Sequence, residues 1–152
     1  MLEQPLKIRD FHRDDLGTLH DIDRICFPEG IAFSRDELLF SLNHPEGITR
    51  VAEAQGRVAG FVLVRLETRR QAHVITLDVV PEVRRCGIGS LLMEDVHEIM
   101  KRRKVGISIL EVGKSNLAAR RLYERLKYRH VDTLSGYYNR CEDAFRMVRI
   151  FD

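Results

Sequence analysis

Apolar residues recur along this chain at two spacings, and each spacing predicts one kind of secondary structure. In four segments they recur every three or four residues, as on the buried face of a helix. These predicted helices cover residues 14–26, 35–42, 88–99 and about 115–126. Ser34 and Glu37 form a capping-box pattern before the second helix, and Pro28 disfavours continuation of the first.

In seven other segments, apolar and β-branched residues alternate or run together, which is typical of strands. The predicted strands cover residues 6–11, 48–54, 58–66, 73–80, 105–112, 129–134 and 144–151. Gln55-Gly56 is a plausible hairpin turn between two of them, and Pro81 ends the fourth. The order of elements is therefore β-α-α-β-β-β-α-β-α-β-β.

This order predicts the fold class. An antiparallel meander is followed by a strand–loop–helix–strand crossover, which places two strands parallel. We expect one α+β domain over residues 1–152, with a mixed, mostly antiparallel sheet of about seven strands and four helices on both faces. In the third helix His97 falls opposite the apolar stripe that begins at Ile88, so we expect His97 to face solvent.

Charge and cysteine usage narrow the class of protein. The net charge of +2, from 25 basic and 23 acidic residues, excludes a strongly basic nucleic-acid binder. No apolar run is long enough for a membrane span. Cys26, Cys86 and Cys141 are too scattered for a disulfide framework, so we expect a cytoplasmic protein. The histidines have no metal-binding spacing, and we expect no metal.

A glycine-rich loop, Arg84-Arg85-Cys86-Gly87-Ile88-Gly89-Ser90, lies between a predicted strand and a predicted helix. Glycines allow close approach of the backbone, and the amides at a helix start attract anions. A pyrophosphate is the natural ligand, although a tight turn with exposed arginines would also explain the glycines. The loop is neither a Walker A motif nor a dinucleotide fingerprint.

Two further residues are candidates for acid–base chemistry. Glu111 ends an apolar row with Ile107 and Ile109, where desolvation would raise its pKa toward that of a working base. Tyr123 lies on the apolar stripe of the last helix and could protonate a leaving group. A salt-bridged surface glutamate and a core tyrosine are the alternative interpretations.

These motifs together resemble those of a known superfamily. Arg84-x-x-Gly87-x-Gly89 is similar to the (Arg/Gln)-x-x-Gly-x-(Gly/Ala) signature of the GNAT acetyltransferases. The stretch from Leu110-Glu111-Val112 through Ser115-Asn116 to Leu122-Tyr123 resembles the ribosomal-protein-alanine (RimI-like) branch. Tyr137-Tyr138 and Glu142-Asp143-Ala144 are similar to the ending of that branch.

The resemblance implies acetyl-CoA as cofactor and assigns roles to individual residues. It implies Glu111 as general base and Tyr123 as general acid. The residues that it implies for cofactor binding are Leu77, Asp78, Val79, Arg84, Arg85, Cys86, Gly87, Ile88, Gly89, Ser90, Asn116 and Tyr123. For the acceptor it implies Phe27, Pro28, His73 and Tyr138, with Tyr137 as a further candidate.

Four residues, at three places in the chain, depart from the family pattern. Lys127-Tyr128 stands where Gly-Phe is usual, and Gly113 replaces a residue such as Arg. Cys86 replaces a basic or polar residue and would place a thiol at a helix start, where thiols can be reactive.

The resemblance implies an N-acetyltransferase that acts on the α-amine of a protein by direct attack in a ternary complex. The acceptor could instead be a small-molecule amine or a lysine side chain, and a non-catalytic CoA-binding sensor is the alternative from another class. The expected partners are an acceptor protein N-terminus or a small amine, with no nucleic acid and no membrane, and the chain is expected to be a monomer or homodimer.

Overall fold

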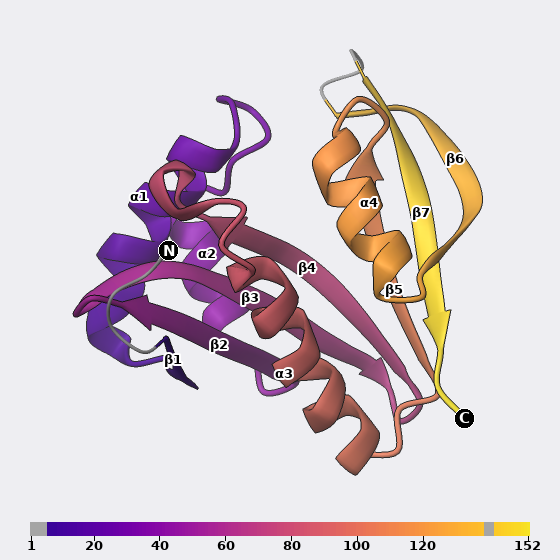
Figure 1. The fold of residues 1–152 in the computed structure, drawn as a ribbon, viewed down its shortest axis with the longest axis horizontal. Helices are drawn as coiled ribbons and strands as arrows, with labels where there is room; N and C mark the ends of the chain where they lie inside the picture. Colours follow the sequence, from indigo (N-terminus) through magenta and orange to yellow (C-terminus); the bar gives the residue numbers. More distant parts are fainter. Residues whose placement is uncertain (1–5, 139–141) are drawn as a thin grey trace.

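The computed structural model describes residues 6–138 and 142–152, which form a mixed sheet between two layers of helices (Figure 1). The strands are β1 (Lys7–Asp10), β2 (Gly47–Ala54), β3 (Arg57–Thr68), β4 (Gln71–Val79), β5 (Ile107–Gly113), β6 (Arg129–Tyr138) and β7 (Glu142–Ile150). The helices are α1 (Leu16–Cys26), α2 (Arg35–Leu42), α3 (Ile88–Arg102) and α4 (Leu117–Arg125), with 3-10 turns η1 (Arg13–Asp15) and η2 (Pro81–Val83). The predicted order of strands and α-helices is confirmed.

The seven strands form one sheet in the order β1-β2-β3-β4-β5-β7-β6. Every neighbouring pair is antiparallel except β4 and β5, which the α3 crossover makes parallel, as predicted. None of the helices in the described ranges is long and apolar enough to cross a membrane.

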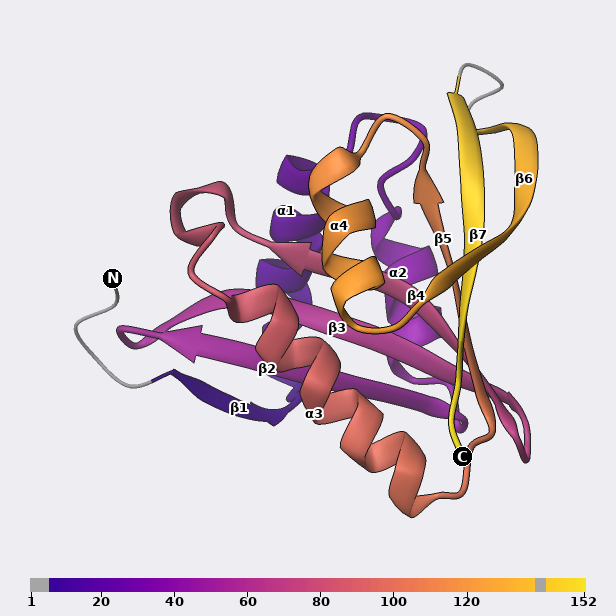
Figure 2. The same cartoon turned by 45° about the vertical axis from the view of Figure 1, so that its right-hand side comes forward.

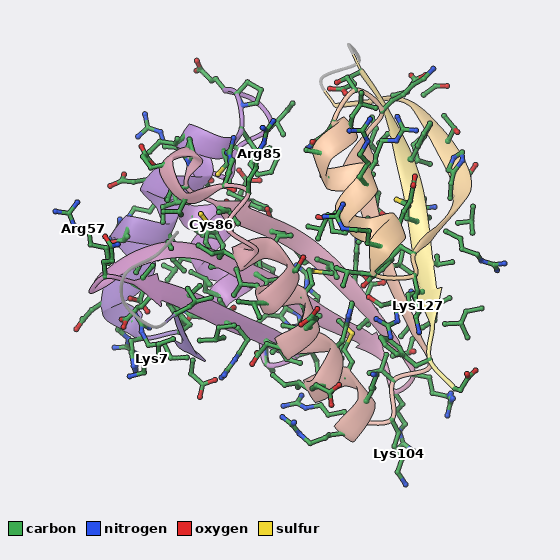
Figure 3. The ribbon with its side chains drawn as sticks, in the orientation of Figure 1. Lys7, Arg57, Arg85, Cys86, Lys104 and Lys127 are labelled. Atoms are coloured by element: carbon green, nitrogen blue, oxygen red, sulfur yellow. The ribbon has the colours of Figure 1, made fainter. Side chains whose placement is uncertain are left out.

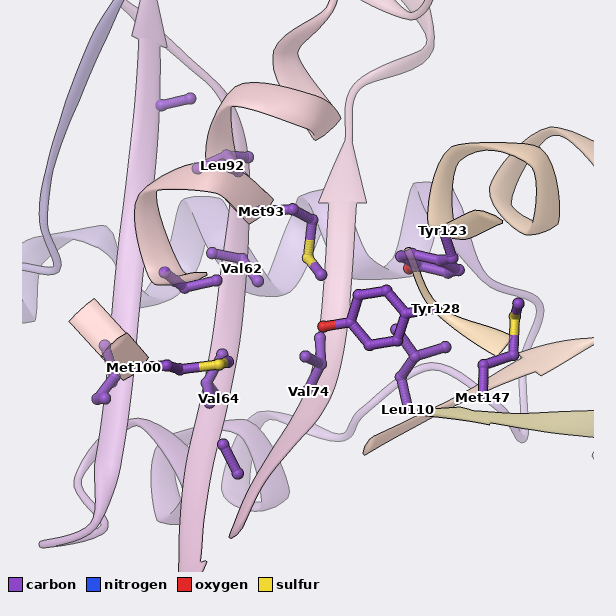
Figure 4. Packing of buried hydrophobic residues seen from close by; sticks show 14 of the residues in the cluster. Val62, Val64, Val74, Leu92, Met93, Met100, Leu110, Tyr123, Tyr128 and Met147 are labelled. Atoms are coloured by element: carbon purple, nitrogen blue, oxygen red, sulfur yellow. The ribbon is translucent and has the colours of Figure 1, made fainter. Parts of the chain in front are cut away.

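Helices cover both faces of the sheet, as predicted (Figure 2). On one face α1 and α2 pack on Val51 and Phe61 through Leu19 and Leu38. On the other face α3 and α4 pack on β2 to β5, and Figure 4 shows part of this larger cluster of buried residues. Apolar surface buried on both faces is what holds the sheet between its helices.

Local sequence signals fix several boundaries. Gln55 (φ 55°) and Gly56 (φ 74°) both adopt the left-handed conformation that a tight two-residue hairpin requires. Ser34 accepts a hydrogen bond from the amide of Glu37, and the carboxylate of Glu37 accepts one from the amide of Ser34. This reciprocal capping box starts α2 at the predicted residue, Arg35.

The prediction that His97 faces solvent is wrong. His97 is 2% exposed, whereas Leu91 of the same helix, which the apolar periodicity predicts to be buried, is 43% exposed. The buried arc of α3 is wider than the stripe and includes Met93 and Met100. His97 is stabilised there because its Nε2 lies 2.8 Å from the Tyr128 hydroxyl, which is also 2.7 Å from Ser108 Oγ.

β4 and β5 pair only at their starts. Their register runs from Gln71 opposite Ile107 to His73 opposite Ile109, and beyond these residues the strands diverge (Figures 1 and 2). β4 continues to pair with β3 as far as Val79. Backbone groups of β4 after His73 therefore have no β5 partner and remain able to bind a ligand in the gap.

Candidate active site

Three adjoining cavities occupy the gap between β4 and β5. The middle cavity, of about 220 Å³, is lined by β4, β5, α4 and the chain after α1. It shares Tyr123 and Asn116 with a cavity at the glycine-rich loop, and it shares Glu111 with a cavity on the α1 side of the sheet. Phe27 lines all three. The splayed strands thus create a passage from the glycine-rich loop to the opposite face of the sheet.

The glycine-rich loop forms one end of this passage. Gly87 is the N-cap of α3 with φ 83°, a left-handed conformation in which glycine is favoured. Arg85 is also left-handed, with φ 67°, which is unusual for a residue that carries a side chain. The amides of the first turn of α3 point out of the helix without backbone partners, so this end can bind an anion.

Most of the predicted cofactor residues line the cavity at the glycine-rich loop. They are Leu77, Val79, Arg84, Arg85, Gly87, Ile88, Gly89, Ser90, Asn116 and Tyr123. Two predicted residues do not: the Asp78 side chain is fully buried, and Cys86 is exposed on the loop beside Arg85 (Figure 3). The guanidinium of Arg84 donates to the Val79 carbonyl (3.0 Å) and to Cys26 Sγ (3.4 Å), which ties the loop to β4 and α1.

Glu111 lies where the middle cavity meets the cavity on the α1 side. Its Oε1 is 2.6 Å from His73 Nε2, and its Oε2 accepts a hydrogen bond from Arg146 Nε at 3.2 Å. The other ring nitrogen of His73 is 2.8 Å from Glu67 Oε1. With a carboxylate at each nitrogen, the imidazolium form of His73 is favoured because it donates to both.

The expectation that the pKa of Glu111 lies above its ordinary value is wrong. Burial does act in that direction, but the hydrogen bonds and positive charges of His73 and Arg146 outweigh it and lower the pKa. The hydrogen bond to Glu111 in turn raises the pKa of His73, and burial opposes this only in part. His73 and Glu111 therefore form an ion pair whose proton is held on the imidazole side.

Tyr123 lines the middle cavity from α4 and is 7% exposed. Its ring packs edge-on against that of Tyr128 at 5.8 Å (Figure 4). Asn116 caps the helix, because its side chain accepts a hydrogen bond from the amide of Ala119 at 3.2 Å. Both side chains thus combine a structural contact with a position on the cavity wall.

Gly113, one of the departures from the family pattern, has a local structural reason. A Cβ at this position would lie 2.7 Å from Oε1 of Glu142. That oxygen accepts hydrogen bonds from the amide and the hydroxyl of Ser115. A small residue at 113 lets Glu142 hold the turn that leads into Asn116 and α4.

The α1 side of the passage combines apolar and polar side chains. Its cavity, of about 450 Å³, has an apolar part formed by Phe27, Ile31, Phe33 and Ile75. Its polar part is formed by Asp23, His73, Thr76, Glu111 and Tyr137. Pro28 lines the adjoining middle cavity.

The sequence interpretation placed less weight on Tyr137 than on Tyr138, yet it is Tyr137 that lines the α1-side cavity. Burial, ahead of the negative charge of Glu111, raises the pKa of Tyr137. The side chain of Tyr138 lies outside the described part of the structure. Arg146 was missed, although it stands directly opposite Glu111 in the β5–β7 register. Among the described residues no group of three or more acidic, histidine or cysteine side chains could hold a metal ion.

Comparisons with known proteins agree with this geometry. The model of the acetyltransferase (GNAT) family matches residues 16–128. The chain is 32% identical to an N-alpha-acetyltransferase of Saccharolobus solfataricus, over 93% of this chain and 91% of that protein. It superposes on Ard1 from Thermoplasma volcanium with a TM-score of 0.88 and 26% identity, covering 97% and 98% of the two chains. The ribosomal-protein-S18-alanine N-acetyltransferase from Escherichia coli has the same fold, with a TM-score of 0.87, 23% identity and coverage of 96% and 94%.

Proposed function

The chain belongs to the acetyltransferase (GNAT) family, and we propose that it transfers the acetyl group of acetyl-CoA to the N-terminal α-amine of a protein. The observation that carries this proposal is the passage between β4 and β5. It joins an anion-binding loop at one end to a cavity with apolar and polar walls at the other, with Glu111 and Tyr123 on the walls between them.

The described residues fit acetyl-CoA, which supplies an activated acetyl thioester when bound. The first turn of α3 and Arg85 would hold its phosphates. The β4 backbone that has no β5 partner would hold the amides of its pantetheine arm, beside Leu77 and Val79. Asn116 would contact the arm from α4.

The acceptor must lose a proton before it can attack, because an α-amine is mostly protonated below a pH of about 8. Glu111 is ionised and faces the passage, so it can bind and orient the ammonium group. The raised pKa of His73 is closer to that of an α-amine. Once His73 has lost its own proton, in the fraction of the protein that grows as the pH rises through this pKa, it is the better proton acceptor of the two. The two side chains therefore act as one base, with the proton ending on the pair.

Attack of the amine nitrogen on the thioester carbonyl is followed by cleavage of the carbon–sulfur bond. Tyr123 lies on the wall shared with the cofactor cavity, where its hydroxyl can donate a proton to the departing sulfur. Phe27, Ile31 and Tyr137 would contact the first side chain of the acceptor, and Pro28 and Tyr138 would contact the chain that follows it.

We also propose that residues 1–152 act as one domain in the cytoplasm, as a monomer or homodimer. One sheet includes every described strand, and Cys26 and Cys86 are free thiols, which supports a reducing compartment.

The release of free CoA from acetyl-CoA tests the reaction. The panel holds a peptide with a free N-terminus and no lysine, a peptide with a blocked N-terminus and one lysine, and a polyamine. We expect turnover on the free N-terminus alone. Equal or faster turnover on the lysine peptide or the polyamine would refute an α-amine acceptor, and acetyl-CoA binding without turnover on any would favour a sensor.

A further inference from the structure

Two carboxyl groups lie buried together beside the acceptor cavity. Asp23 of α1 and Asp78 of β4 are both 0% exposed, and they lie close enough together for Asp23 to raise the pKa of Asp78. Neither belongs to the catalytic pair. Among the described residues neither acid forms a salt bridge, so the position of the two acids needs another reason.

The hydrogen bonds of the pair account for only half of its oxygens. Asp23 Oδ2 accepts from the amide of Phe33 at 2.7 Å, and Asp78 Oδ1 accepts from the hydroxyl of Thr76 at 2.5 Å. Within residues 6–138 and 142–152, Asp23 Oδ1 and Asp78 Oδ2 have no donor. A single proton between the two carboxyls satisfies both remaining oxygens at once, whereas two buried negative charges in contact would repel each other.

The partners of the pair are parts of the acceptor cavity. Asp23, Phe33 and Thr76 all line it, and Phe33 ends the loop that brings Phe27 and Ile31 to its wall. The hydrogen bond from the Phe33 amide to Asp23 ties this loop to α1. The contact of Asp23 with Asp78 then ties it to β4. We propose that Asp23 and Asp78 share one proton, and that this carboxyl–carboxylate hydrogen bond positions the loop between α1 and α2 as a wall of the acceptor cavity. The role in acceptor binding rests on the function proposed above.

The surroundings agree with a retained proton. Burial first, and then the hydrogen bond to Asp23, raises the pKa of Asp78 well above its ordinary value. Burial, followed by the negative charge of Asp78, also raises the pKa of Cys26 on α1. The positive charge of Arg84 acts on Asp78 in the opposite direction. The charged or titratable groups that face the pair, or face it across the cavity, are Cys26 of α1, Arg84 of the loop after η2, His73 of β4, Glu111 of β5 and Tyr137 of β6.

At alkaline pH the shared proton is lost, and repulsion between the two carboxylates should loosen the loop. In the wild type the KM for the acceptor should then rise, while the KM for acetyl-CoA stays constant. Asp23→Asn keeps a donor toward Asp78 and an acceptor for the Phe33 amide, but it has no proton to lose. Asp23→Ala removes both bonds.

Steady-state kinetics across pH with these two variants tests the positioning role. At neutral pH we expect Asp23→Ala to raise the acceptor KM about tenfold, with little change in the KM for acetyl-CoA. Asp23→Asn should restore the acceptor KM and remove its rise at alkaline pH. An Asn variant that behaves like the Ala variant, or that keeps the alkaline rise, would overturn the proposal.

A second measurement does not depend on activity. The amide resonance of Phe33 in a ¹H–¹⁵N spectrum should show a titration step at a pH well above the ordinary range of a carboxyl group in the wild type, and no such step in Asp23→Asn. Its absence from the wild type would overturn the shared proton. A wild type that shows the step but acetylates no peptide would refute the proposed function and leave the shared proton standing.

Discussion

Acidification should destabilise this protein through His97 on α3. The ring is 2% exposed, its Nδ1 accepts a hydrogen bond from Arg149 Nη1 at 3.0 Å, and its Nε2–H therefore donates to Tyr128. Burial, together with the positive charges of Arg149 and Lys101, lowers its pKa from 6.5 to about 3. The folded protein thus holds His97 neutral at pH values where the unfolded chain protonates it.

The size of the effect follows from the two pKa values. A lowered pKa in the folded state means that stability is intact above the unfolded pKa of 6.5 and falls as the pH drops from 6.5 toward 3. The loss approaches about 1.4 kcal/mol per pH unit in that window. Between pH 7.5 and pH 5 it amounts to about 2 kcal/mol, and any folded pKa below about 4 gives nearly the same value.

The assay compares variants by urea unfolding at fixed ionic strength, followed by circular dichroism because the chain has no tryptophan. His97→Gln replaces the ring with a side chain that donates and accepts but does not titrate. We expect this variant to be less stable than the wild type at pH 7.5. Between pH 7.5 and pH 5, however, its free energy of unfolding should fall by about 2 kcal/mol less than that of the wild type. Other titrating groups affect both proteins and cancel in this difference.

Tyr128→Phe is the matched control. It removes a hydrogen-bond partner of His97 but leaves the ring buried beside Arg149. It should be less stable than the wild type at both pH values with a similar fall between them. A wild-type fall that His97→Gln does not reduce would refute a neutral, buried His97.

Four other changes test parts of the site. Gly87→Ala forces a left-handed φ of 83° on a residue with a Cβ, which costs about 1–2 kcal/mol, so we expect weaker CoA binding by calorimetry and a lower Tm. Gly113→Ala should push the flexible Glu142 side chain off Ser115 with little change in Tm, and an unchanged amide resonance of Ser115 would contradict the 2.7 Å approach. Tyr123→Phe should reduce kcat about 100-fold with little change in the acceptor KM, and an unchanged kcat would remove it as the acid. In the wild type kcat/KM should rise with pH through a midpoint above 6.5, the ordinary pKa of histidine, and His73→Gln should lack this step in a pH–rate profile.

Elements that depend on neighbours in sequence could be predicted from the sequence. The capping box at Ser34, the turn at Gln55-Gly56 and the cap at Asn116 each involve residues within three positions of one another. The crossover between β4 and β5 follows from chain order and handedness. These signals were enough to predict the seven-stranded fold and the place of the glycine-rich loop.

Features that depend on pairing across the sheet could not be predicted in the same way. The pKa of Glu111 is set by Arg146 on β7 and His73 on β4, and alternation along β5 carries no information about either. Likewise His97 is buried because Tyr128 and Arg149 supply its partners, which helical periodicity alone does not reveal. The pairing of β4 and β5 stops after His73 and Ile109, and the divergence beyond these residues creates the passage.

The rate of acetyl transfer by Glu111→Gln tests the central claim most directly. The measurement is kcat/KM for a free-N-terminus peptide, with the Kd for acetyl-CoA determined by calorimetry on the same protein. Gln keeps the size of the side chain but removes the charge that binds the ammonium group and His73. We predict a loss of at least about 100-fold in kcat/KM with an unchanged Kd for acetyl-CoA. A variant that acetylates the peptide at the wild-type rate would contradict the assignment of His73 and Glu111 as the base.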